Sequence, residues 1–385
     1  MEQVAAALSA IAELDFPGND SSASSSDDPV SPGNVDGHAI KLYNPASCHS
    51  VRECCGVTLR GIAESFITDP AFGGTEAGEA PGRSQRGKAK GTSSKKSLFS
   101  AGVTYHAAPS GPYLARTITG AELKLIGRTI SRTAEHLQDC ANSLLPRYYL
   151  IFRVGNNSTF SKAPHWAIMD NPNDLPLPVV QRFDIKGCPD TRITKVKGGE
   201  SGSMLKCGNL PMVGGAHSFP QVSPWGVRQL LTALKADLAL LEELRVTNYS
   251  LLVIVAPKRG EGEESHYTIR APQRKPYARL EGQDCTLFAF VVDTLQEWVA
   301  ASSVWRVFTF FKGPAKAKEQ LSASPEPFAA RMLTFLEAAF HEQESKSENV
   351  NWANAVRTRA SLSSPPKYDV ASPTQPVAPP PSPED

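Results

Sequence analysis

Three short, nearly uninterrupted apolar runs limit the fold of this chain more than any other feature. They are residues 148–154 (YYLIFRV), 249–255 (YSLLVIV) and 286–293 (TLFAFVVD). Runs of this length that are rich in Val, Ile and Phe are typical of buried β-strands. The last run ends on a carboxylate, Asp293. The sequence therefore predicts three buried strands, one of which carries an acid at its end.

Two further segments have the periodicity of amphipathic helices. Leucines recur at helical spacing over about 226–244, namely Leu230, Leu231, Leu234, Leu238, Leu241 and Leu244. A second helix is predicted after Ser324-Pro325-Glu326, which combines an N-cap, a first-turn proline and a first-turn acid. Its apolar stripe is Phe328, Met332, Phe335, Leu336 and Phe340. Helices mixed with antiparallel-type strands over about 36–345 predict an α+β fold.

The other segments have the composition of linkers and tails. The chain of 385 residues contains 31 Pro and 28 Gly, more than a compact domain usually has. We predict a disordered segment over 1–35, because 19–34 is polar, acidic and broken by prolines. We also predict a basic flexible insert over 73–97 and a proline-rich disordered tail over 346–385.

Charge and cysteine content limit the compartment and the partners. The 40 Lys and Arg balance 39 Asp and Glu, so no global field attracts nucleic acid, and we expect no nucleic-acid partner. No apolar window is long enough for a membrane-spanning helix, and the N-terminus lacks the basic region of a secretory signal. The seven cysteines form no Cys-x-x-Cys pair, which favours reduced thiols in a cytoplasmic protein.

Two acidic positions are candidates for phosphate and metal chemistry. Asp184-Ile185-Lys186-Gly187 follows the apolar Val179–Val180, and an acid and a lysine this close can serve a phosphate–metal site. The alternative is a solvated strand end followed by a turn. Asp293 could hold Mg²⁺, which needs one or two carboxylates together with substrate phosphates. The alternative for Asp293 is the N-cap of a helix over 294–300.

Other chemistries lack their sequence signatures. The chain has no His-Glu-x-x-His motif, no zinc-spaced Cys/His cluster and no Gly-x-Ser-x-Gly motif. It also lacks the Gly-x4-Gly-Lys-Ser/Thr phosphate loop. The sequence therefore does not indicate a zinc hydrolase, a serine hydrolase or a P-loop nucleoside triphosphatase.

Six segments, taken in order, resemble the phosphatidylinositol phosphate kinase family over about residues 40–345. The segments are 41–67, 143–154, 183–187 (FDIKG), 248–252 (NYSLL), 291–296 (VVDTLQ) and 324–335. FDIKG is similar to the family's (Y/F)DLKG signature, and NYSLL is similar to its MDYSLL motif, here preceded by a helical segment that contains Asp237. The resemblance implies the two-lobed lipid-kinase fold, with antiparallel sheets and flanking helices. The N-lobe would span about 36–170 and the C-lobe about 171–345.

The resemblance also implies an activity and its setting. A family member uses ATP and Mg²⁺ to phosphorylate a phosphatidylinositol phosphate lipid at a membrane surface. The expected acceptor is phosphatidylinositol 4-phosphate, at its 5-hydroxyl. We accordingly expect a cytoplasmic protein with peripheral attachment to the plasma membrane, and a homodimer is compatible with the family.

Roles for individual residues follow from the same resemblance. Asp293 would hold Mg²⁺, Lys186 would contact the ATP phosphates, and Asp184 would act on the inositol hydroxyl. Gly102, Arg116 and Glu122 occupy the nucleotide-binding positions. The expected substrate and membrane contacts are Arg192, Lys312, Lys316 and Lys318.

Three positions depart from the family pattern. Arg116 replaces the ATP-binding lysine, and Lys and Arg are not interchangeable at a tight phosphate site. Asn248 replaces the acid of MDYSLL, and an amide cannot accept a proton. The glycine-rich loop keeps only Gly102. The sequence therefore leaves two hypotheses open: an active lipid kinase, or a weakened relative that binds phosphoinositides or a partner kinase.

Overall fold

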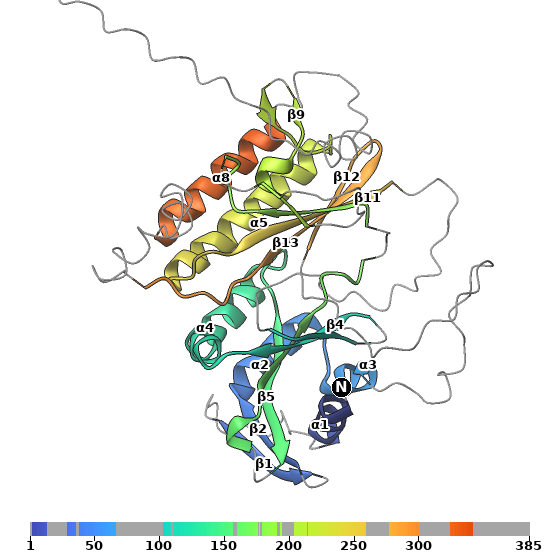
Figure 1. Cartoon of the computed structure of the whole chain (residues 1–385), viewed down its shortest axis with the longest axis vertical. Helices are drawn as coiled ribbons and strands as arrows, with labels where there is room; N and C mark the ends of the chain where they lie inside the picture. The colour runs from blue at the N-terminus through green and yellow to red at the C-terminus, as the bar shows by residue number, and fades with distance from the viewer. Residues whose placement is uncertain are drawn as a thin grey trace, which may run out of the picture.

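The computed structural model describes residues 2–13, 29–35, 38–66, 103–108, 111–156, 160–175, 177, 179–190, 193–194, 204–213, 215–258, 277–299 and 324–341. These residues form two lobes stacked along the long axis of the molecule (Figure 1). Each lobe is built on its own β-sheet. The α+β class and the flanking helices are as predicted, and the strand pairs of both sheets are antiparallel except for one parallel pair in the C-lobe.

The N-lobe contains a six-stranded antiparallel sheet in the order β1-β2-β5-β6-β4-β3. Its strands are β1 (Val30–Val35), β2 (His38–Tyr43), β3 (Tyr105–Ala107), β4 (Tyr113–Ile118), β5 (Tyr148–Asn156) and β6 (His165–Asp170). Its helices are α1 (Glu2–Glu13), α2 (Pro45–Cys55), α3 (Leu59–Phe66) and α4 (Gly120–Asp139), with a short 3₁₀ turn, η1, at Phe160–Lys162. Apolar clusters pack on both faces of this sheet, which explains the apolar run in β5.

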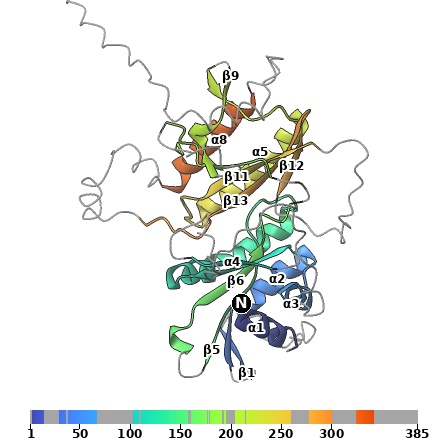
Figure 2. The ribbon, with the colours of Figure 1, turned by 45° about the vertical axis from the view of Figure 1, so that its right-hand side comes forward.

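The C-lobe contains a five-stranded sheet in the order β12-β13-β11-β7-β8. Its strands are β7 (Gln181–Ile185), β8 (Met204–Lys206), β11 (Ser250–Pro257), β12 (Ala278–Glu281) and β13 (Cys285–Val292). Helices α5 (Pro224–Glu243) and α8 (Pro325–His341) lie side by side against this sheet (Figures 1 and 2). The small hairpin of β9 (Met212–Val213) and β10 (Ala216–His217) and a 3₁₀ turn, η2 (Cys207–Asn209), complete the lobe.

The predicted strands and helices are confirmed with small shifts at their ends. The three apolar runs are β5, β11 and β13, and all three are central in their sheets. The leucine-rich segment is α5, and the segment after Ser324 is α8. The leucine stripe of α5 and the aromatic stripe of α8 meet in one core cluster, in which Leu234 and Phe328 are fully buried.

The prediction of a disordered segment over 1–35 is wrong at both ends of that range. Residues 2–13 form α1, which packs on α3, and residues 30–35 form β1 at the edge of the N-lobe sheet. The reason is visible in α1: Val4, Ala7, Leu8 and Ile11 lie on one face and are almost completely buried. Residues 14–28 lie outside the described part of the chain, as do the predicted insert 73–97 and tail 346–385.

All seven cysteines are free thiols in the structure, as predicted. Cys54 and Cys55 are adjacent at the end of α2, and their sulfur atoms are 3.6 Å apart without a disulfide. Among the described residues, no helix combines the length and the apolar character that crossing a membrane requires.

Candidate functional site

The motif residues of the C-lobe meet at one end of its sheet. β11 pairs antiparallel with β7 and with β13, so that Leu251 faces Ile185 and Ser250 faces Val292. Lys186 directly follows β7, Asp293 directly follows β13, and Asn248 lies just before β11. Antiparallel pairing therefore brings the end of two strands and the start of a third to the same edge.

Asp293 is at the centre of this edge. Its backbone is left-handed, with φ of 62°, a conformation that a non-glycine residue adopts at some cost and that often marks a functional position. Burial raises the pKa of its carboxyl; Lys186 and Arg116 act against this rise, and Asp184 adds to it. The Asp293 carboxylate is thus close enough to interact with a lysine, an acid and an arginine.

The alternative in which Asp293 caps a helix is wrong. Residues 294–299, which would form most of that helix, contain no helical turn and instead make an isolated bridge from Glu297 to Val246. The backbone therefore does not use Asp293 as a cap. Its carboxylate is available for another role.

Lys186 is buried, with 5% of its surface exposed, and its ammonium lies beside the start of β11. Its Nζ donates to the carbonyl oxygen of Asn248 and, at 3.2 Å, to that of Tyr249. These bonds fix the backbone of the NYSLL motif against the FDIKG motif. The lysine expected at the ATP phosphates is therefore also a structural link between the two motifs.

Asp184 is paired with a lysine that the sequence analysis did not single out. β7 and β8 run parallel with Asp184 opposite Lys206, and the Nζ of Lys206 contacts Asp184 Oδ2. The Asn209 side chain holds β8 in place, since its Oδ1 accepts the backbone N–H of Lys206 at 3.0 Å and that of Thr194 at 2.7 Å. β8 is only three residues long, so no periodicity marked it.

Arg116 reaches the site from β4 of the N-lobe. It is 6% exposed, and its Nη2 donates to Glu122 Oε1 at 2.6 Å. The other oxygen of Glu122 accepts the backbone N–H of Thr119 at 2.7 Å, which completes the capping box of α4. Burial alone would lower the pKa of Arg116, but its neighbours, of which Tyr148 is the strongest, raise it.

Asn248 has a left-handed backbone, with φ of 59°, which asparagine tolerates better than most residues. Its Nδ2 donates to Gln296 Oε1 at 2.6 Å. The Asn248 side chain, which stands where the family has an acid, is therefore hydrogen-bonded to the segment that follows Asp293.

The structure brings six of the predicted site residues into one region between the lobes: Asp184, Lys186, Asn248 and Asp293 from the C-lobe, and Arg116 and Glu122 from the N-lobe. Lys206 joins them. The remaining predicted residues, Gly102, Arg192, Lys312, Lys316 and Lys318, lie outside the described residues.

The donor set of this region fits Mg²⁺ bound together with phosphates. Mg²⁺ commonly takes one or two carboxylates and completes its octahedron with phosphate and water oxygens. Asp293 and Asp184 supply two carboxylates that interact electrostatically. Within the described part of the chain, no group of three or more His, Cys, Asp or Glu side chains gathers as a dedicated metal cage.

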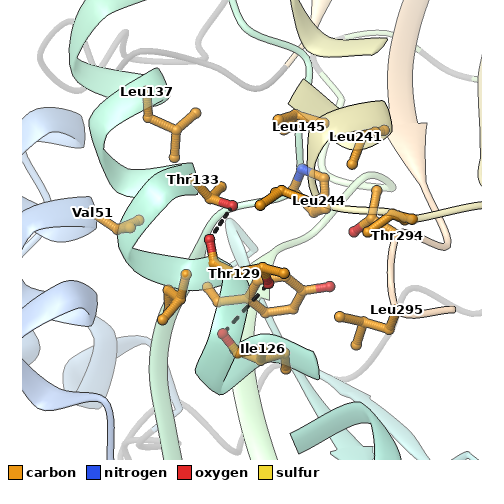
Figure 3. Close-up of a pocket in the computed structure, with 14 residues that line it drawn as sticks. Val51, Ile126, Thr129, Thr133, Leu137, Leu145, Leu241, Leu244, Thr294 and Leu295 are labelled. Carbon is orange, nitrogen blue, oxygen red and sulfur yellow. Dashed lines mark hydrogen bonds between the residues drawn. The ribbon is translucent and has the colours of Figure 1, made fainter. Parts of the chain in front are cut away.

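A small apolar pocket lies where α4 faces the C-lobe, and Thr294, which follows Asp293 in the sequence, is among its lining residues (Figure 3). Its volume is about 30 Å³. Thr129, Thr133 and Leu137 of α4 line one side, and Leu241, Leu244 and Leu295 line the other. The threonine hydroxyls are turned back to carbonyls of their own helix, at 2.9 Å, so the pocket wall is mainly apolar.

Comparison with known proteins gives one consistent group of relatives. Residues 92–278 match the family described as Phosphatidylinositol-4-phosphate 5-Kinase. The chain is 23% identical to the phosphatidylinositol 5-phosphate 4-kinase type-2 alpha of Gallus gallus over 239 residues, which are 60% of this chain and 54% of that protein. It is 26% identical over 153 residues to phosphatidylinositol 4-phosphate 5-kinase 8 of Arabidopsis thaliana, covering 40% of this chain and 19% of the relative.

A third relative is a probable phosphatidylinositol phosphate kinase of Dictyostelium discoideum. It is 26% identical over 153 residues, covering 39% of this chain and 20% of the relative. The chain thus spans about half the length of the Gallus gallus protein and about a fifth of the other two.

Proposed function

We propose that the chain carries a catalytic domain of the phosphatidylinositol phosphate kinase family and is a lipid kinase, because residues 92–278 match that family and its relatives are named as kinases of this class. It transfers the γ-phosphate of ATP to a phosphatidylinositol phosphate in the presence of Mg²⁺. The acceptor we propose is phosphatidylinositol 4-phosphate, and the position is its 5-hydroxyl. The protein would act in the cytoplasm, attached peripherally to the plasma membrane, with no nucleic-acid partner and with a homodimer as a compatible state.

The observation that carries this proposal is the environment of Asp293. A carboxylate held at a strand end, in a left-handed backbone, interacts with three cations, Lys186, Arg116 and Lys206, and with a second carboxylate, Asp184. Phosphoryl transfer requires mainly that donor and acceptor be held in line and that the developing charge be neutralised. Two acids and several cations where the lobes meet would supply these functions.

Each residue of the candidate site has a proposed role in this reaction. Asp293 and Asp184 would hold Mg²⁺, which when bound would supply positive charge to neutralise that of the phosphates. Arg116 would contact the nucleotide phosphates, positioned by Glu122. Asp184 would also receive the proton of the inositol hydroxyl, because Asn248 cannot accept one. Lys206 holds the Asp184 carboxylate in place through its ion pair.

A second candidate function, binding without phosphate transfer, is supported by the contacts of Arg116 and Asn248. The Arg116 guanidinium is buried and paired with Glu122, so a nucleotide phosphate must share it. The Asn248 side chain is bonded to Gln296 and lacks an acid's proton affinity. In this case the protein would bind phosphoinositides or a partner kinase as a scaffold.

The primary test is transfer of radiolabelled γ-phosphate from ATP and Mg²⁺ to vesicles that contain mixed phosphoinositides. Label in a bisphosphate lipid that disappears in the Asp293→Ala variant would support the lipid kinase, and the position of the new phosphate identifies the acceptor. No label, with vesicle binding intact and no thermal shift on adding ATP, would support the scaffold.

The double variant Arg116→Lys, Asn248→Asp separates the two candidates further. An active kinase should keep similar or modestly higher turnover when the family residues are restored. A change from undetectable to robust turnover would contradict the kinase proposal, because it would show that these two residues had removed the activity.

A further inference from the structure

Helix α4 faces the C-lobe with a regular stripe of basic residues. Arg128, Arg132 and His136 are four residues apart and therefore lie on one side of the helix. Each meets a different acid of the C-lobe. Arg128 Nη2 is 2.7 Å from Glu297 Oε2, and Arg132 Nε is 3.0 Å from Glu243 Oε1. His136 Nε2 donates to Asp237 Oδ1 at 2.7 Å.

The three pairs differ in how much water reaches them. The side chains of Arg128 and Glu297 are 58% and 37% exposed, and those of Arg132 and Glu243 are 43% and 53% exposed. The side chains of His136 and Asp237 are 9% and 0% exposed. Exposed ion pairs contribute little to stability and are screened by salt. A buried, hydrogen-bonded pair is screened much less. The C-terminal end of α4 is thus the firmly held end.

The Asp237 carboxylate accepts three hydrogen bonds from the N-lobe side. Besides His136, its Oδ1 accepts the hydroxyl of Ser143 at 2.7 Å, and its Oδ2 accepts the backbone N–H of Leu144 at 2.7 Å. The Leu144 carbonyl in turn accepts the backbone N–H of Val291 at 3.0 Å. Val291 is two residues before Asp293, so the end of α4 is linked to the strand that carries the proposed metal ligand.

A small void interrupts the packing of the middle of this helix on the C-lobe. The small pocket shown in Figure 3 separates Thr129 and Thr133 of α4 from Leu244 and Leu295 of the C-lobe. A gap of this kind forfeits the dispersion contacts that would otherwise hold the two surfaces together. Around the pocket, Leu125 of α4 belongs to the C-lobe core cluster, and Leu295 packs on the cluster that contains Ile126 and Ile130. The alignment of α4 against the C-lobe therefore rests on these apolar contacts together with the polar contacts of its basic stripe.

We propose that Asp237 is a positioning residue that acts as the pivot of α4 on the C-lobe. Glu122 is 14 residues before His136, about 21 Å along the helix axis. A tilt of about 10° around the Asp237 end displaces Glu122 by about 4 Å. Since Glu122 holds Arg116, this tilt sets how Arg116 faces Asp293. Only the consequence for phosphate transfer depends on the proposed function.

Hydrogen exchange of α4 amides, measured without ATP or lipid, tests the pivot itself. In Ser143→Ala, which removes one donor, exchange over 134–139 should rise about tenfold, the effect of one hydrogen bond to a charged group. Glu243→Gln and Glu297→Gln, which break exposed pairs, should instead raise exchange only slightly, over 120–127, and should mimic the effect of high salt on the wild type. Glu337→Gln breaks an exposed pair with Lys235, 3.0 Å apart, between α5 and α8, and is the matched control.

Asp237→Asn tests the consequence for the site. It should raise exchange along all of α4 and lower kcat tenfold or more with little change in KM for the lipid, whereas Ser143→Ala should do the same more weakly. Equal exchange in the two halves of α4 in every variant, or loss of thermal stability with unchanged exchange, would overturn the pivot. One further outcome is that the wild type transfers no phosphate while the variants still change amide exchange in the two halves of α4 independently. In that case the proposed function fails and the pivot stands.

Discussion

At the scale of single residues, Asp293 combines two unfavourable features. Its backbone is left-handed, and burial raises the pKa of its carboxyl above the ordinary value of 3.8. A carboxyl that is easier to protonate in the folded state destabilises the fold when it is ionised. The penalty is therefore present at neutral pH and disappears as the pH falls through the folded pKa towards 3.8. Residues of this kind are retained at functional sites.

We predict that Asp293→Asn unfolds at higher denaturant concentration than the wild type at pH 7 in the absence of metal. The difference should shrink as the pH is lowered towards 4, because the wild-type carboxyl then becomes neutral. Addition of Mg²⁺ with ATP should stabilise only the wild type. Equilibrium unfolding in urea at several pH values measures these effects. A stability difference that does not depend on pH would contradict the account of the buried charge.

Two features require glycine at position 187 of the FDIKG motif: a left-handed backbone and the close approach of helix α8. Its φ is 70°, and a Cβ there would lie 2.9 Å from the carbonyl oxygen of Arg331 and 3.0 Å from the Cα of Met332 in α8. We predict that Gly187→Ala costs about 1 to 2 kcal/mol for the left-handed conformation and a further 1 to 3 kcal/mol, roughly, for overpacking against backbone.

The matched control is Gly56→Ala. Gly56 has a similar φ of 66°, but a Cβ there would meet no atom within 4 Å. Its substitution should cost only the conformational part, and the free energy of unfolding of both variants measures the difference. Equal losses would show that contact with α8 is not what requires glycine in the motif.

At the scale of elements, α4 begins with a capping box that also belongs to the candidate site. The Thr119 side chain accepts the backbone N–H of Glu122 at 3.2 Å, and Glu122 returns a bond to Thr119 while it pairs with Arg116. We predict that Thr119→Ala costs about 1 kcal/mol, the usual value of an N-cap. Glu122→Gln keeps an acceptor for the cap but leaves a buried guanidinium without its charged partner, so its cost should exceed about 2 kcal/mol.

Thermal unfolding and nucleotide affinity, measured together, distinguish these effects. Thr119→Ala should lower stability and leave ATP affinity nearly unchanged, because Arg116 keeps its partner. Glu122→Gln should change both. If Thr119→Ala weakened ATP binding as much as Glu122→Gln, the cap and the ion pair would not be separable functions of this helix start.

Elements with strong local signals were predictable from the sequence, and short ones were not. β5, β11 and β13 are buried on both faces and therefore read as apolar runs, and α5 and α8 carry complete apolar stripes. β8 has three residues, so Lys206 had no pattern to mark it. α1 has a buried apolar face, but the polar, proline-broken sequence after it suggested disorder for the whole N-terminal segment.

At the scale of the whole molecule, the site exists only where the lobes meet. Arg116 and Glu122 come from the N-lobe, and Asp184, Lys206 and Asp293 come from the C-lobe sheet. The sequence indicates the motif residues individually, through family resemblance, but not which of them are in contact. The pairing of Lys206 with Asp184 depends on the register of two parallel strands that are joined by a long connection. Register of this kind is a tertiary property.

The last prediction concerns attachment to a membrane. With a net charge of +1, the protein has no global attraction to anionic lipid, so local lysines must supply it. Lys312, Lys316 and Lys318 lie between Asp293 and α8 in the sequence. At about 1 kcal/mol per lysine near an anionic surface, their joint replacement by Gln should weaken binding to phosphatidylinositol 4-phosphate vesicles by about two decades.

Vesicle sedimentation at low salt measures this loss, and it should become small at high salt. The control replaces three exposed lysines elsewhere, Lys124, Lys162 and Lys258, by Gln. Both variants carry the same net charge of −2, since three positive charges are removed from +1. Equal weakening in the two variants would mean that net charge, rather than the segment after Asp293, controls membrane binding. Selective weakening in the first variant would mean that the segment between Asp293 and α8 in the sequence carries the membrane contact.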